Sequence, residues 1–266
     1  MNGDIHVHSR YSTDSETPME AVVKRAVELG LPYICFTDHV DFDFPYDDIK
    51  FEFDPSEYFK EIRELRVRYG DRLKIFGGVE LGMQEKVAQR NRDFLREWPF
   101  DFAIGSQHLV FGMDPYYPET FEGRSETEVY RRYFEETYAN VRAFHDFDSL
   151  GHLDYIVRYG AKRGKSYTYR QYADIIDEIL KLLVRYNLAL EINTAGIRKQ
   201  LGHPNPHPDI LRRYRELGGT LVTMGSDAHR PHAMGFAFDT ARDILKECGF
   251  THTVYYEKRK PHFVLL

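Results

Sequence analysis

Cysteine is scarce in this chain of 266 residues, which has only Cys35 and Cys248, each alone in an apolar stretch. Two isolated cysteines make no disulfide framework, and this favours a reducing compartment. Long apolar runs are lacking too, and no stretch approaches the roughly 18 residues that a membrane-spanning helix needs. The first ten residues contain charged and imidazole side chains but no apolar core, so we expect no signal peptide. These features predict a cytoplasmic protein without a membrane partner.

A surplus of positive charge is also missing. Lysine and arginine number 36 against 42 acidic residues, and the formal net charge is -6. Because nucleic-acid binders usually carry a basic face, this balance argues against a nucleic-acid partner. No Gly-x-Gly-x-x-Gly or Walker pattern follows the first predicted strand, which removes the main support for a nucleotide-binding doubly wound sheet.

What the chain does have is a regular alternation of short apolar runs and longer amphipathic segments. The pattern predicts strands over 3–8, 33–37, 73–81, 101–105, 149–152, 188–193 and 220–225. It predicts helices over 17–30, 55–69, 84–98, 125–144, 169–186, 208–217 and 234–248, with a hairpin in the tail. Seven strand–helix units in succession indicate an α/β fold with a parallel sheet, either a closed barrel or an open sheet. Two long loops, 40–53 and 109–124, are candidate binding loops.

Side chains of the kinds that bind metals recur where the predicted strands end. The set comprises His6, His8, Asp14, Asp38, His39, Glu80, His108, His152, Glu191, Asn193, Asp227 and His229. Each motif alone has an ordinary explanation, such as a helix cap or a polar turn. Together they are better explained by one site, because the carboxyl ends of parallel barrel strands share the face that carries the active site.

This set has too many histidines and carboxylates for a single four-ligand ion. A multinuclear site with shared carboxylates fits better, and mixed imidazole and carboxylate ligands favour Mn, Fe or Zn over Mg. Of the histidines away from the strand ends, His203 and His232 are weaker pocket candidates.

Six motifs, taken in order, resemble the PHP (polymerase and histidinol phosphatase) family over essentially the whole chain. They span residues 4–8, 37–39, 78–80, 105–108, 151–154 and 226–229. Residues 191–199 and the pair Tyr116-Tyr117 look like the monofunctional histidinol phosphatase branch of that family.

The resemblance implies a single domain over 1–266 that folds as a distorted (β/α)7 barrel with a trinuclear metal site. His6, His8, Glu80 and Asp227 would hold one ion; Glu80, His108 and His152 a second; and Asp14, His39 and His229 a third. Many members of the family have histidine where this chain has Asp14.

The implied reaction is hydrolysis of L-histidinol phosphate to L-histidinol and phosphate, a step of histidine synthesis. Glu80, Asp227, His229 and Asp38 are the candidate catalytic residues, and Arg158 and Arg198 the candidate phosphate clamp. Metal-bound water, Asp38 and a loop histidine are all candidates for the proton donor to the leaving alkoxide. Glu191, Asp41 and Asp43 are candidates to face the substrate's amine.

Two other functions remain open at this point. One is a PHP phosphodiesterase or nuclease, or a phosphatase for another small monoester; the negative net charge disfavours nucleic acid as its substrate. The other is a non-catalytic metal-binding module, which should show gaps in the ligand set, and this sequence has none. The oligomeric state is not predicted.

Overall fold

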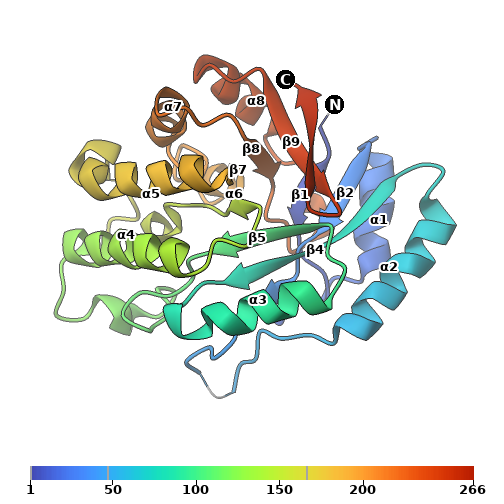
Figure 1. The fold of residues 1–266 in the computed structure, drawn as a ribbon, viewed down its shortest axis with the longest axis horizontal. Coiled ribbons are helices and arrows are strands. Elements are labelled where there is room, and N and C mark those ends of the chain that lie inside the picture. Colours follow the sequence, from blue (N-terminus) through green and yellow to red (C-terminus); the bar gives the residue numbers. More distant parts are fainter. Residues whose placement is uncertain (1, 47, 166) are drawn as a thin grey trace.

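The computed structural model describes residues 2–46, 48–165 and 167–266, in which strands alternate with helices (Figure 1). The strands of the main sheet are β1 (Asp4–Val7), β2 (Tyr33–Phe36), β3 (His39–Val40), β4 (Lys74–Gly82), β5 (Phe102–Ser106), β6 (Ser149–Leu150), β7 (Ala189–Asn193) and β8 (Val222–Gly225). The α-helices are α1 (Met19–Glu28), α2 (Pro55–Tyr69), α3 (Ala88–Glu97), α4 (Glu126–Ala143), α5 (Ala173–Tyr186), α6 (Ala195–Arg198), α7 (Pro208–Glu216) and α8 (Phe238–Glu247).

Within the described residues, β1, β2, β4, β5, β6, β7 and β8 pair in that order, and every neighbouring pair is parallel. The first and last strands meet through a short parallel contact between Val7 and Ala228. There the His8 amide donates to Ala228 O over 2.9 Å, and the Asp227 amide donates to His6 O over 2.8 Å. The sheet therefore closes almost completely, which confirms the predicted distorted (β/α)7 barrel.

Local sequence accounts for the helices around the barrel. The Asp54 carboxylate accepts the Ser56 amide at the start of α2, and Pro55 occupies its first turn. Ser125 and Glu128 form the predicted capping box of α4. The apolar stripe of α5 is buried, as its 3.6-residue period predicts.

Several elements differ from the sequence prediction. The four-residue α6 is an addition, the helices predicted from residues 84 and 169 begin with 3-10 turns, and three further differences have a local cause. The short β3 is an addition, which pairs with β4 so that His39 lies opposite Glu80. The strand predicted over 149–152 ends at Leu150, because the His152 amide turns away and donates to Glu191 Oε2 over 2.8 Å. The helix predicted from residue 234 begins at Phe238, because Gly235 and Ala237 have positive φ angles of 62° and 55°.

The predicted tail hairpin is confirmed as β9 (His252–Glu257) and β10 (Lys260–Leu265). Its buried Val254 and Tyr256 pack in one apolar cluster with residues from the amino ends of the barrel strands, among them Ile5, Phe102 and Leu221. Arg259 adds an ion pair with Asp148, and the Lys258 amide donates to Asp101. This end of the barrel is thus sealed by apolar packing, and the polar residues discussed below lie at the opposite end.

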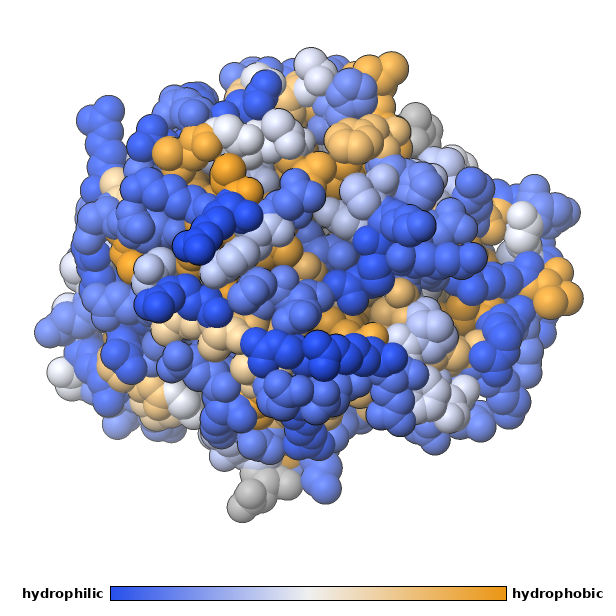
Figure 2. All heavy atoms as spheres, in the orientation of Figure 1, coloured by the Kyte–Doolittle hydropathy of each residue, from blue (hydrophilic) through white to orange (hydrophobic). Residues whose placement is uncertain are grey.

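No helix in the described part of the chain has the length and apolar character needed to cross a bilayer. On the face drawn in Figure 2, hydrophilic side chains predominate and apolar ones form small scattered groups. The exposed large apolar side chains include Tyr116, in the loop that follows β5, and Phe263 and Leu265 on β10.

Candidate metal centre

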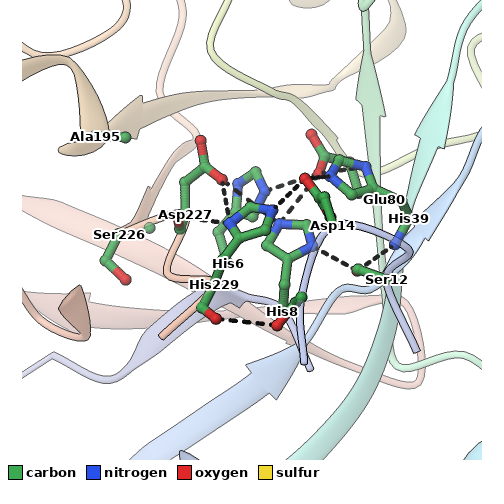
Figure 3. A network of polar contacts seen from close by, with 12 residues as sticks. His6, His8, Ser12, Asp14, His39, Glu80, Ala195, Ser226, Asp227 and His229 are labelled. Carbon is green, nitrogen blue, oxygen red and sulfur yellow. Dashed lines mark hydrogen bonds and ion pairs between the residues drawn. The ribbon is translucent and has the colours of Figure 1, made fainter. Parts of the chain in front are cut away.

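The carboxyl ends of the barrel strands carry a dense group of imidazoles and carboxylates (Figure 3). All nine residues predicted as metal ligands belong to it. They are His6 and His8 of the β1 end, Asp14 beyond it, His39 of β3, Glu80 of β4, His108 after β5, His152 after β6, and Asp227 and His229 after β8. The residues come from six separate parts of the barrel, so the closed fold is what brings them together.

Glu80 lies at the centre of this group and is fully buried. Its Oε1 lies 2.9 Å from His152 Nε2 and 3.2 Å from His108 Nε2. Its Oε2 lies 3.1 Å from His6 Nε2, 3.4 Å from His8 Nε2 and 3.3 Å from His39 Nδ1. One carboxylate thus presents a separate oxygen to each of two sets of imidazoles, as a bridging ligand must.

Close ligand triads match two of the three predicted ion sites. His6, His8 and Glu80 form one, and Glu80, His108 and His152 form another. A third triad joins His8, His39 and His229, and a fourth, which the sequence did not predict, joins His39, Asp41 and His108.

Asp14 and Asp227 complete this arrangement from two loops. Asp14 Oδ2 lies 3.0 Å from His229 Nε2 and 3.9 Å from His39 Nε2, and its side chain does not cap α1. Asp227 Oδ1 lies 3.6 Å from His8 Nε2. The backbone of Asp227 is left-handed, with φ 54°, and the hydrogen bond from its N–H to His6 O holds it there. Both carboxylates therefore face the imidazoles with which the sequence grouped them.

Three of the four histidines whose Nε2 faces Glu80 have a hydrogen-bond partner behind the ring, on the Nδ1 side. Glu191 Oε1 lies 2.5 Å from His6 Nδ1, Asp41 Oδ1 lies 2.7 Å from His108 Nδ1, and Ser12 Oγ lies 2.9 Å from His8 Nδ1. When Nδ1–H donates to such an acceptor, the lone pair is left on Nε2, the atom that faces Glu80. This backing is the usual way in which proteins orient histidines that bind metals.

The donor set fits a group of divalent cations. Among the described residues, His8 Nε2, His39 Nδ1 and Asp41 Oδ2 are buried atoms with no hydrogen-bond partner. The His8 ring also stacks on His229 and His39, with centroids 4.0 and 4.4 Å away. Buried polar atoms are normally paired, so unpaired nitrogens aimed at carboxylates indicate that cations satisfy them.

The electrostatics of the carboxylates and of His8 agree with this assignment. Burial lowers the pKa of His6, His39 and His108, but the facing carboxylates outweigh it and raise that pKa, so these three imidazoles must lose a proton when a metal ion binds. Burial raises the pKa of Glu80, but His6 and the other facing histidines outweigh it and hold that pKa well below its usual range. The pKa of Asp227 is likewise held well below its usual range, where histidines and Arg158 overcome burial. Burial and two neighbouring imidazoles push the pKa of His8 well below normal. Ionised carboxylates and a neutral imidazole are the forms that bind metal ions.

Four residues predicted to face the substrate have other partners. Glu191 is buried behind His6, Asp41 is buried behind His108, and Asp43 pairs with Arg90. Asp38 is fully buried and accepts hydrogen bonds from Ser9 and Ser12, and burial raises its pKa to about 6. The expectation that Asp38 protonates a leaving group therefore does not match its placement, which supports the loop carrying Ser12.

A cleft of about 340 Å³ opens above the ligands. Arg158 and Arg198, the predicted phosphate clamp, both line it. So do His232, one of the two weaker histidine candidates, and three residues that the sequence analysis did not single out: Tyr155, Lys199 and Arg230. His203 is not among the lining residues; its Nδ1 contacts Pro204 O. Arginine and lysine side chains thus line the cleft above a site that is rich in carboxylates.

Sequence reasoning missed Ser12, Ser106 and Asn205. Ser106 donates to Glu80 Oε1 over 2.6 Å, and Asn205 accepts from Arg158. Ser106 carried a usable signal, because it lies two residues before His108 at a strand end. Asn205 carried none, since its contacts depend on how a loop folds back on β7.

A nearly closed parallel barrel with imidazole and carboxylate clusters at the carboxyl ends of its strands defines a metal-dependent enzyme. Such enzymes use divalent cations to polarise a bound substrate. The arginine and lysine side chains that line the cleft suit it to an anionic substrate. The chain belongs to the PHP domain family, whose profile matches residues 4–195.

Relatives of known name match almost the whole chain. A protein of Lactococcus lactis named histidinol-phosphatase is 35% identical over 93% of this chain and 91% of its own. A Clostridium acetobutylicum protein named "Probable histidinol-phosphatase" is 36% identical over 96% of this chain and 97% of its own. The crystal structure of the histidinol phosphate phosphatase of L. lactis, complexed with zinc, L-histidinol and phosphate, has a TM-score of 0.89 and 33% identity, covering 97% of this chain and 98% of that one.

Proposed function

We propose that this protein hydrolyses L-histidinol phosphate to L-histidinol and phosphate, as one metal-dependent phosphatase domain over residues 1–266. The observation that carries the proposal is the convergence of the nine ligand candidates beneath a cleft lined by arginines: six histidines and Glu80 form shared triads, and Asp14 and Asp227 face those histidines. The similarity to the L. lactis enzyme, which binds zinc, L-histidinol and phosphate, supports the choice of substrate.

The metal set in this proposal comprises up to three divalent transition ions, with Mn, Fe and Zn as candidates. The Glu80-centred triads would hold two of them, and His39 and His229 with Asp14 the third. When bound, such ions polarise phosphate oxygens and lower the pKa of water, so that it can attack phosphorus.

The chain's own residues supply charge and orientation. Arg158 and Arg198 line the cleft and would bind the phosphate dianion through charge-assisted hydrogen bonds. Arg198 also donates to Ser226 O and Asp227 O over 2.8 and 2.9 Å, which fixes its direction. With Asp38 buried elsewhere, the candidates for the proton donor are metal-bound water and His232, a loop histidine that lines the cleft. A cytoplasmic location stays a prediction, which cell fractionation would check.

The test is phosphate release from L-histidinol phosphate, from p-nitrophenyl phosphate and from a phosphate diester, each before and after chelation. We expect the highest kcat/KM on L-histidinol phosphate, loss of activity on chelation, and recovery when divalent ions are restored. A preference for the diester would favour the phosphodiesterase alternative, and no hydrolysis of any ester by the metal-loaded protein would favour a non-catalytic module.

The two arginines separate these functions further. A monoester presents a dianion, so loss of either charge-assisted contact should cost about 1.5–3 kcal/mol, or roughly ten- to a hundredfold in kcat/KM. A diester carries one charge and should suffer less from Arg158→Ala or Arg198→Ala. Equal losses on both kinds of ester would contradict the monoester assignment.

A further inference from the structure

Arg158 is held in one orientation by its surroundings. It ends the short 3-10 helix η3 (Tyr155–Arg158) after β6, and its side chain is 7% exposed. Its Nε donates to Asn205 Oδ1 over 2.9 Å, one terminal nitrogen to Asp227 Oδ2 over 3.2 Å, and the other to Asn193 Oδ1 over 3.3 Å. Its guanidinium carbon lies 4.9 Å from the centre of the Tyr155 ring. The remaining N–H groups are the ones left for a ligand in the cleft.

Asn205 is the residue that fixes the inner edge of this guanidinium. It is fully buried, and its Nδ2 donates to Asp154 Oδ1 over 2.6 Å. Asp154 is also fully buried, and its other oxygen accepts the His207 amide over 2.9 Å. A carboxylate only accepts hydrogen bonds, so the amide NH2 of Asn205 must face Asp154 and its carbonyl oxygen must face Arg158.

The backbone makes this amide rigid. Asn205 and Asn193 exchange two backbone hydrogen bonds, of 2.7 and 2.9 Å, which tie the loop after α6 to the end of β7. Gly196 lies so close that a Cβ there would come within 2.8 Å of Asn205 Oδ1. A side chain enclosed in this way cannot turn without moving the loop, so Arg158 has a fixed acceptor at Nε.

We propose that Asn205, oriented by Asp154, is a positioning residue that aims the Arg158 guanidinium at the phosphate of the bound ester. Neither Asn205 nor Asp154 is among the residues that line the cleft, so both act through Arg158. This inference rests on the proposed phosphatase function, and it adds Asn205 and Asp154 to the residues that position the phosphate-binding arginine.

A double-mutant cycle tests the coupling. Asn205→Ala should lower kcat/KM for a phosphate monoester about tenfold, a usual effect of removing a residue behind a binding group. In an Arg158→Ala background the same change should lower kcat/KM less than about twofold, because the guanidinium through which Asn205 acts on the substrate is already absent. Losses that add in full, or unchanged kinetics of Asn205→Ala, would overturn the proposal.

Asn91→Ala is the matched control. Asn91 is also a fully buried asparagine, which donates to Gly82 O from α3 over 3.1 Å. Its loss should destabilise the fold and have the same kinetic effect with and without Arg158. If Asn205→Ala fails to fold, Asn205→Ser replaces it, since its hydroxyl leaves room for a water beside Asp154.

A second readout does not depend on turnover. Inorganic phosphate should raise the Tm of the metal-loaded protein, because it binds the folded state. We expect that rise to shrink in Asn205→Ala and in Arg158→Ala by similar amounts, with metal content unchanged, and to persist in Asn91→Ala. A shrinking rise without activity on any ester would refute the proposed function but not the positioning role. A full rise in Asn205→Ala would refute the positioning role alone.

Discussion

Glu80 presents its two oxygens to different imidazoles, so its removal should affect two ion sites at once. We expect Glu80→Ala to fold, because the barrel core does not depend on it, and to lose more than about a hundredfold in activity together with bound metal. Metal analysis of the purified variant and phosphate release check this. Glu64→Ala, an exposed change on α2, is the control. Full metal content and normal turnover in Glu80→Ala would contradict the bridging role.

Asp14 is a milder case, since it is partly exposed at the rim of the cleft and its carboxylate faces His229 and His39, which belong to one predicted ion site. Asp14→Ala should weaken binding of the ion at His39 and His229 by at least about tenfold and leave the Glu80 triads loaded. Titration of the apoprotein with a divalent metal should then show one weakened site. Asp43→Asn removes the charge that pairs with Arg90 and suits the left-handed backbone at this position, so it should titrate like the unaltered protein. A uniform weakening of every site would show that Asp14 does not serve one ion.

Among the elements, α5 and α7 are joined by a pair of charged side chains. Arg213 donates to both oxygens of Asp177, with a shortest distance of 2.7 Å, and the Tyr169 hydroxyl donates to one of them. Burial raises the pKa of Asp177, but these hydrogen bonds outweigh it and lower the pKa overall. A carboxylate with a lowered pKa stabilises the fold above its unfolded pKa, near 3.9, and this stabilisation is lost as the pH falls through the folded value.

Asp177→Asn should therefore lower the Tm at pH 7 by about 1–4 °C, since both partners keep some contact with water and the pair contributes about 1 kcal/mol at most. The difference from the unaltered protein should stay nearly constant down to about pH 4 and narrow below it, as the carboxylate is protonated in the folded state. Thermal unfolding followed by circular dichroism from pH 7 down to about pH 2.5 measures it. Glu178→Gln, on the exposed face of the same helix, should change little. A Tm difference that stays constant with pH would mean that the ion pair is not its cause.

The elements also show what a sequence can predict here. Parallel barrel strands are buried on both faces, so apolar runs such as 33–36 mark them, and the strand-end rule then locates the ligands. The sequence does not predict β3 or the early end of β6. Each strand has only two residues, and its length depends on contacts with Glu80 or Glu191 that come from other parts of the chain. Sequence likewise places Asp41 and Glu191 at the right end of the barrel but does not tell which way they point. Both turned out to support histidines rather than to face the substrate.

At the scale of the whole molecule, the ligands tie together strand ends from β1 to β8, so bound ions should cross-link the barrel. Removing them leaves buried imidazoles without partners. With ions at about a thousand times their Kd, each site adds roughly 4 kcal/mol of stability. Chelation should therefore lower the Tm by more than about 5 °C.

Differential scanning calorimetry before and after dialysis against a chelator measures that change, and restoring a divalent ion should reverse it. Magnesium serves as a control, because it prefers all-oxygen ligands and should restore less of the Tm than Mn or Zn. An unchanged Tm after proven metal loss would mean that the barrel is stable without its ions.

The left-handed backbone of Asp227 decides which side chains evolution or an engineer can place there. Aspartate and asparagine enter that region more readily than most residues, because their short polar side chains bond locally, and glycine enters it freely. Glutamate would keep the carboxylate, yet it would meet the steric cost of positive φ and carry its oxygens one methylene further out. Asparagine would keep the backbone and lose the charge. Where the site requires both the left-handed backbone and the negative charge, aspartate is therefore the one residue type that fits this position.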